Sequence, residues 1–142
     1  MLEIVDPLRL NVLSLPPVLR KSHAEELLGH AGRHPHAVAY DVLADYSRVT
    51  AFDIATDDIV RFALQRRAGL PETPSHVLKT AIVGARDEVW SVLEIMTAFF
   101  EEERRAMKIR RFDTVEATLD WLDRLEALDT VRASLAALSA RQ

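Results

Sequence analysis

The stretch VAYDVLADYSRVTAFDIATDDIVRFALQRRA, residues 38–68, decides the fold. Its first part, Val38 to Tyr46, is rich in apolar and β-branched residues and predicts a strand. Its last part, from about Thr56 to Ala68, predicts a helix. The apolar residues of that helix share one face: Ile59, Phe62 and Ala63. A strand that runs through a turn into a helix is the repeating unit of α/β sheets, so an α/β fold is expected.

The residues before this stretch predict a hairpin and a helix. Residues 2–15 alternate apolar and polar positions around Asp6-Pro7, which is typical of two short strands, and Pro16-Pro17 ends them. Ser22 and Glu25 have the spacing of a capping box, in which each side chain satisfies a free backbone amide of the other residue. We expect the helix that starts there to run towards Gly29 or Gly32.

The residues after it continue the alternation of strands and helices. Gly69, Pro71 and Pro74 predict a loop. The following elements are a strand over Val77–Val83 closed by Gly84, a helix over about Arg86–Glu103, a basic strand over Met107–Phe112 and a helix capped by Asp113 with Glu116. The buried stripe of this last helix is predicted to contain Val115, Leu119, Leu122 and Leu125.

This order predicts an N-terminal β-hairpin followed by alternating helices and strands. The right-handed crossover rule converts it into a mixed, largely parallel sheet of four to five strands with packed helices. Residues 1–142 are expected to form one domain, with 129–142 as a C-terminal helical extension. That tail spaces its apolar residues as a helix does and is either a lid on the domain or a partner-binding helix: Leu128, Val131, Leu135 and Leu138.

Composition narrows the function. The chain of 142 residues has no cysteine, which excludes disulfides, thiolate nucleophiles and sulfur-based zinc sites. A net charge of −4 argues against nucleic acid as a partner, because such binding depends on cations that displace phosphate counterions. The start of the sequence resembles no secretory signal and no run is long enough for a membrane span, so a cytoplasmic protein is expected.

Part of the opening stretch resembles a known signature. Asp45, Ser47, Val49 and Asp53 are similar to the D-x-S-x-V-x-x-x-D pattern of STAS domains, the sulfate-transporter and anti-sigma-factor-antagonist family, and residues 2–125 resemble the SpoIIAA-like branch of that fold. The resemblance implies a regulatory module of the bacterial type that binds proteins or small ligands, usually without catalysis.

The sequence departs from the antagonists at their phosphorylated serine. The residue directly after Asp53 is Ile54, which has no hydroxyl to accept a phosphate, and Thr56 stands where the pattern has glycine. Thr56 could substitute as an acceptor, but Thr followed by Asp57 and Asp58 is typical of a helix N-cap with acidic first-turn residues, and we expect the cap. The turn is then an interaction surface composed of Asp45, Ser47, Asp53, Ile54, Thr56 and Asp57.

The other candidate metal-binding and catalytic residues are explained better by structural roles. The carboxylates of Asp45, Asp53, Asp57 and Asp58 could hold Mg²⁺, although turns and caps explain them without a metal. A second metal-ligating candidate is the histidine group His30, His34 and His36, but Gly32 and Pro35 should break the helix that would align them, so a solvated loop is expected. No catalytic motif supplies a base for Ser47, and no cofactor is expected.

Two clusters suggest partners. Five cations are expected on a solvated face with Glu101–Glu103, with contact to an acidic partner or lipid headgroup as the alternative: Arg104, Arg105, Lys108, Arg110 and Arg111. The aromatic residues Trp90, Phe99 and Phe100 crowd one helix and could form a homodimer interface.

The sequence therefore predicts a non-enzymatic STAS-like module that acts through contacts with a protein partner it does not identify. Two alternatives stay open. One is a carrier of a small apolar or lipid-like ligand, held between sheet and helices. The other is a small Mg²⁺-dependent enzyme that uses the Asp45, Asp53, Asp57 and Asp58 cluster.

Overall fold

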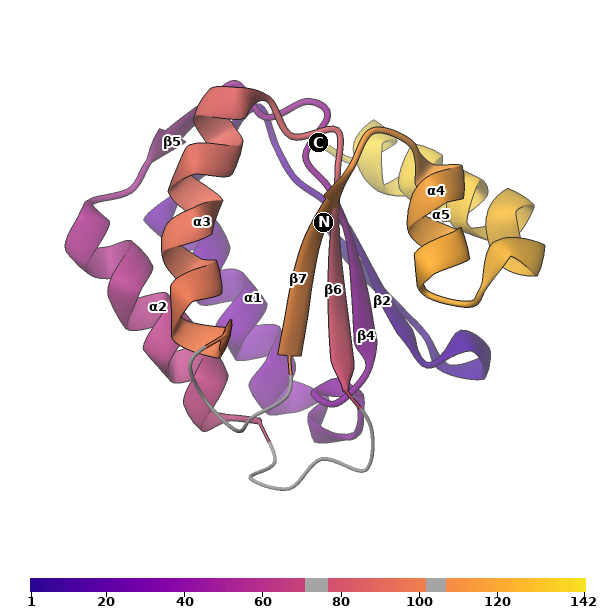
Figure 1. Ribbon diagram of the computed structural model, residues 1–142, viewed down its shortest axis with the longest axis horizontal. Coiled ribbons are helices and arrows are strands. Elements are labelled where there is room, and N and C mark those ends of the chain that lie inside the picture. The colour runs from indigo at the N-terminus through magenta and orange to yellow at the C-terminus, as the bar shows by residue number, and fades with distance from the viewer. Residues whose placement is uncertain (71–76, 102–106) are drawn as a thin grey trace.

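Five strands form one mixed sheet in the computed structural model of the chain, in the order β1-β2-β4-β6-β7 (Figure 1). The structure describes residues 1–70, 77–101 and 107–142, without the side chains of Met96, Phe99, Phe100 and Glu101. The strands of this sheet are β1 (Leu2–Val5), β2 (Leu10–Ser14), β4 (Asp41–Asp45), β6 (Leu78–Val83) and β7 (Met107–Phe112). β1 and β2 pair antiparallel, and every other pair is parallel. The predicted α/β fold, with its N-terminal hairpin and largely parallel sheet, is confirmed.

Helices cover both faces of the sheet (Figure 1). One face carries α1 (Lys21–Arg33), α2 (Thr56–Ala68) and α3 (Asp87–Glu101), and the other carries α4 (Val115–Trp121) and α5 (Leu128–Ala140). Short 3-10 turns connect them: η1 (Asp6–Leu8), η2 (Pro35–Ala37) and η3 (Leu125–Ala127). Within the described ranges, no helix is long and apolar enough to cross a membrane.

A second sheet was not predicted from the sequence. β3 (Val18–Arg20) and β5 (Ala51–Asp53) pair in parallel beside the main sheet. Each has only three residues, too few for a periodic pattern to be recognised. Thr50 is tied to the same region, because its backbone N–H donates to the Pro17 carbonyl oxygen at 2.8 Å.

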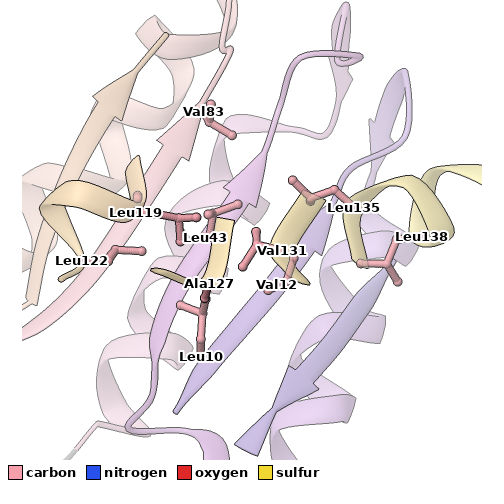
Figure 2. Packing of buried hydrophobic residues seen from close by; sticks show 11 residues of the cluster. Leu10, Val12, Leu43, Val83, Leu119, Leu122, Ala127, Val131, Leu135 and Leu138 are labelled. Atoms are coloured by element: carbon pink, nitrogen blue, oxygen red, sulfur yellow. The ribbon is translucent and has the colours of Figure 1, made fainter. Parts of the chain in front are cut away.

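The face covered by α4 and α5 is closely packed. α5 packs on β1 and β2, while α4 packs on β6 and β7. Figure 2 shows the side chains that meet there, and Leu10, Val12, Leu43, Leu119, Val131 and Leu138 all have 0% exposure. The tail is therefore part of this core. Of the stripe predicted for α4, Leu119 and Leu122 are buried, but the prediction for Leu125 was wrong, because it lies in η3 with 41% exposure.

The helix starts differ from the predicted caps. At α1 the Arg20 N–H donates to Nδ1 of His23 at 3.0 Å, so a ring nitrogen performs the role expected of the Ser22 and Glu25 pair. At α4 the cap is Thr114, whose Oγ1 accepts from the Ala117 N–H at 3.1 Å, one residue after the predicted Asp113. The N-cap therefore lies two residues before Ser22 at α1 and one residue after Asp113 at α4.

A buried ion pair fixes the hairpin against the end of α4. Arg124 Nη1 lies 2.8 Å from Oδ2 of Asp41, while Arg124 Nε donates to the Leu8 carbonyl oxygen at 2.7 Å. The other Asp41 oxygen accepts the Lys79 N–H at 2.8 Å. Both charged side chains are largely buried, so removing one would leave the other uncompensated.

Candidate functional site

A cavity of about 270 Å³ lies between the sheet and the three helices α1, α2 and α3. Its walls are almost entirely apolar. The sheet contributes Leu2, Ile4, Leu13, Val42, Ala44, Ile82 and Ile109, and the helices contribute Leu27, Leu28, Ile59, Phe62, Val92 and Leu93. Empty space of this size is unusual, because protein interiors pack as densely as organic crystals.

The two faces of the same strands differ in how far they are buried. Along β2, Leu10 and Val12 face α5 and have 0% exposure, whereas Asn11 and Leu13 face the cavity and keep part of their surface accessible. Along β4, Leu43 is likewise completely buried and its neighbour Val42 is not. The strands supply apolar side chains to both faces. The difference in burial therefore arises from how closely the helices cover each face.

The helix arrangement accounts for the open space. The main contacts of α1 are with β3, η2 and α2, and those of α2 are with α1 and α3. Only α3 has a main contact with the sheet, through β7 at its edge. Val89 and Leu93 of α3 also share a buried cluster with Ala44 on β4 and Ile82 on β6, so the open space lies beside this contact, towards α1 and α2.

The cavity has a polar end, where the parallel strands begin. Strand register aligns one row of residues across the cavity face of the sheet: Ile4, Asn11, Val42, Thr80 and Ile109. The next row on this face, towards the carboxyl ends of the parallel strands, is apolar from Leu2 through Leu13 and Ala44 to Ile82. The polar members Asn11 and Thr80 therefore lie at one end of the cavity. Arg66, in the last turn of α2, also lines it.

Asn11 and Arg66 bind adjacent backbone carbonyls. Asn11 Nδ2 donates to the Ala37 oxygen at 2.9 Å, and Arg66 Nη1 donates to the Val38 oxygen at 3.2 Å. Because a carbonyl only accepts, this bond fixes the orientation of the Asn11 amide. The Asn11 Oδ1 atom is buried, and no hydrogen-bond donor in the described part of the chain reaches it. Burial also lowers the pKa of Arg66 from its ordinary value.

Two histidines complete this end, contrary to the predicted solvated loop. α1 continues through Gly32 to Arg33, so His30 and His34 lie one turn apart with ring centroids 4.4 Å from each other, and both line the cavity. Burial, and then the charges of His34 and Arg33, lower the pKa of His30 below 6.5. His36 instead contacts Asp6 at 3.1 Å on the surface. In the described ranges no three His, Cys, Asp or Glu side chains form a metal site.

The opposite end of the cavity is apolar and is formed partly by the predicted interaction turn. Ile54, Phe52 and Tyr46 line it. Burial raises the pKa of Tyr46 to about 12, so its hydroxyl stays protonated. Ile54, which the resemblance to STAS antagonists would place at their phospho-acceptor serine, thus lies in the cavity wall.

The other turn residues lie outside the cavity and have partners or structural roles of their own. Asp45 Oδ1 accepts the Ser47 N–H at 2.9 Å, which holds the turn after β4. Asp53 lies 3.7 Å from the Arg20 guanidinium. Ser47 also approaches Gly84, whose φ of +72° and lack of a side chain let the two backbones meet; a Cβ there would lie 2.8 Å from the Ser47 Cβ.

The start of α2 differs from the predicted cap. Thr56 is the first helical residue, Ala55 occupies the N-cap position, and no side chain there accepts a capping hydrogen bond. The N-cap expected of Thr56 was therefore wrong. Asp57 and Asp58 do occupy the first turn, and Asp58 pairs with Arg61. The four aspartates proposed for Mg²⁺ are thus divided among separate structural roles.

The two surface clusters are only partly described. Arg111 donates to the Ala85 carbonyl oxygen and to Asp87, and Arg110 stacks over the Trp121 ring at 5.7 Å, so both support the fold. Arg104 and Arg105 lie outside the described residues. Trp90 is half-buried, packs on the core of α3 and lies 5.9 Å from the Arg111 guanidinium. The side chains of Phe99 and Phe100 lie outside the described part, so the homodimer interface stays a prediction.

Sequence reasoning named a ligand held between sheet and helices only as an alternative, and it did not identify the residues of the cavity or its polar end. Both faces of β2 and β4 carry apolar residues, and their pattern does not record how far away the covering helices lie. One signal was available: Asn11 and Thr80 are polar side chains among the apolar ones that face α1 to α3, and buried polar residues are more informative than exposed apolar ones.

Comparison with known proteins gives no relative for this chain. No protein-family model, no curated protein and no solved structure matches it.

Proposed function

We propose that this chain binds a small apolar or lipid-like molecule in the cavity between the sheet and helices α1 to α3. The observation that carries the proposal is the contrast between the two faces of one sheet. The face under α5 is packed to 0% exposure at Leu10, Val12 and Leu43, while the face under α1 and α2 encloses about 270 Å³. We infer that the space on the face covered by α1 and α2 accommodates a ligand.

The contacts that the cavity lining lacks support this. Apolar side chains that border open space have no atoms on one side to attract them, unlike the side chains packed under α5. An apolar ligand would supply those contacts and remove the lining from water.

The volume limits the size of the ligand. An apolar cavity of about 150 Å³ admits benzene, and pockets for drug-sized molecules begin at about 300 Å³. A cavity of 270 Å³ therefore suits a medium-length hydrocarbon chain or a small ring system. The aliphatic walls hold such a molecule through area burial, at about 0.8 kcal/mol for each methylene group.

A neutral fluorescent probe tests the proposal. N-phenyl-1-naphthylamine gains fluorescence in apolar surroundings, and we expect it to bind the purified protein saturably. Val42→Phe, which places a ring in the cavity where the probe would lie, should weaken its binding at least tenfold. Val77→Phe is the matched control, since Val77 is 38% exposed and lies outside the lining. Fluorescence that does not saturate, or that is unchanged by Val42→Phe, would contradict ligand binding in the cavity.

The resemblance to STAS domains supports a second proposal, a regulatory contact with another protein through the turn. Ser47, Asp53 and Asp57 are exposed there, next to the cavity end lined by Ile54. Affinity capture from native cells should recover a protein that is lost with the double variant Asp53→Ala, Asp57→Ala and retained with Asp129→Ala on α5. Equal recovery with all three baits would refute a role for the turn.

A further inference from the structure

The polar end of the cavity carries information about the ligand beyond its being apolar. Arg66, Asn11, His30 and His34 gather there around residues 34–38, where the helix layer meets the start of the strands. Among the described side chains, the remainder of the lining, towards the strand ends, is apolar apart from Tyr46. A cavity that is polar at one end and apolar along its length matches an amphiphile with one polar head.

We propose that the ligand is a single-chain carboxylate, whose head group pairs with Arg66 and whose hydrocarbon chain extends towards Ile54 and Tyr46. This inference rests on the proposed ligand binding. It assigns a role to a cation that the fold itself does not explain.

Within the described ranges, Arg66 is a cation without an opposite charge. It donates one N–H to the Val38 oxygen, and no carboxylate among the described residues pairs with it. Its neighbour on the same helix, Arg61, pairs with Asp58 on the surface. Charges taken out of water are normally paired, because desolvation disfavours them strongly. The carboxyl end of α2 favours a cation, but that effect is available to an exposed side chain too and does not require Arg66 to face the cavity.

Asn11 supplies an independent indication at the same end. Its Oδ1 atom is buried and unpaired among the described residues. Buried polar atoms of side chains nearly always have a hydrogen-bond partner. Asn11 is close to Arg66 in the site, because Asn11 Nδ2 donates to the Ala37 carbonyl and Arg66 donates to the adjacent Val38 carbonyl. This atom is an acceptor, and an ionised carboxylate has no hydrogen to donate to it, so the donor would be a water molecule that accompanies a polar head group.

The chemistry of this end favours a carboxylate. The guanidinium fork of Arg66 matches the two oxygens of one carboxylate, which it can bind through two parallel hydrogen bonds. The lowered pKa of His30 favours its neutral form, so His30 adds a hydrogen-bonding group beside the guanidinium. A site with one guanidinium suits a head group with a single negative charge.

Three probes with the same chain length test the head group: decanoate, methyl decanoate and 1-decanol. Each is titrated against the bound neutral dye N-phenyl-1-naphthylamine, in wild type and in Arg66→Met, Arg66→Lys and Arg61→Met. We expect wild type to bind decanoate at least tenfold more tightly than methyl decanoate. Arg66→Met should weaken decanoate binding roughly 10- to 100-fold, the range for a hydrogen-bonded charged group, and leave the ester unchanged.

The remaining variants separate charge from structure. Arg66→Lys should restore part of the preference for decanoate, and Arg61→Met should behave as wild type. Equal affinity of wild type for acid and ester, or a preference that survives Arg66→Met, would overturn the carboxylate assignment while leaving the cavity as an apolar site. If neither the dye nor any of the three probes binds, the proposed ligand binding itself fails.

Discussion

The same substitution on the two faces of the sheet should have opposite effects on stability. Val42 on β4 faces the cavity and is half-buried, whereas Val12 on β2 faces α5 and has 0% exposure (Figure 2). Each becomes phenylalanine, a change that adds four carbon atoms. The strands are neighbours in the sheet, so backbone environment and strand propensity differ little between the two sites.

The expected magnitudes follow from the space available. At about 0.8 kcal/mol for each buried carbon group, the ring of Val42→Phe could contribute up to about 3 kcal/mol if the cavity accepts it completely. We expect a gain of about 0–2 kcal/mol, because area sums are upper bounds and the ring must find an unstrained rotamer. Val12→Phe places the same atoms into filled space and should cost about 1–3 kcal/mol or more.

Urea unfolding followed by circular dichroism measures both changes. The midpoint should rise or stay constant for Val42→Phe and fall for Val12→Phe, with similar slopes in the two transitions. A loss of more than about 1 kcal/mol in Val42→Phe, the scale of ordinary overpacking, would refute the claim that this face of the sheet encloses free space.

Two further predictions concern the ionisable groups. Because burial holds the pKa of His30 below 6.5, the unfolded chain takes up a proton there before the folded chain does, so the free energy of unfolding should fall as the pH decreases from about 6.5. Urea midpoints at pH 7.5 and 5.5 should therefore differ less in His30→Gln than in wild type, and equal differences would contradict the assignment. Arg124→Met should cost about 3–5 kcal/mol, since it leaves Asp41 buried without its 2.8 Å partner. The exposed Arg132→Met is its control in thermal unfolding, and equal melting temperatures would show that the buried pair does not stabilise the fold.

The fold was predictable because its strands and helices have strong local patterns. The helix Thr56–Ala68 and the strand Met107–Phe112 were predicted with the observed bounds, and the hairpin around Asp6-Pro7 was predicted as it stands. The errors arose where long-range packing overrides local preference. Gly32 was expected to end α1, but the helix passes through it. At α4, Thr114 caps the helix in place of Asp113, because the Thr114 Oγ1 accepts the Ala117 N–H.

The site was less predictable because it depends on distances between layers. The pattern of β4 shows that Val42 and Leu43 are both apolar, but it does not show that one meets α5 and α4 while the other meets open space. Arg66 is likewise one of several cations near the end of α2, and only the fold shows that it faces the cavity. The turn from Asp45 to Asp57, which the sequence indicated as the site, contributes chiefly Ile54 to that cavity.

The isoleucines of this chain test the central claim directly. Of the six, Ile4, Ile54, Ile59, Ile82 and Ile109 line the cavity, and Ile95 does not. Ile95 is 37% exposed on α3 and serves as the internal control. Protein labelled with ¹³C at the isoleucine δ1 methyl groups is titrated with decanoate and methyl decanoate, and methyl resonances are followed by NMR. We predict that the five cavity methyl groups shift saturably while Ile95 stays in place. Resonances that do not move, or a shift confined to Ile95, would contradict a ligand site in the cavity.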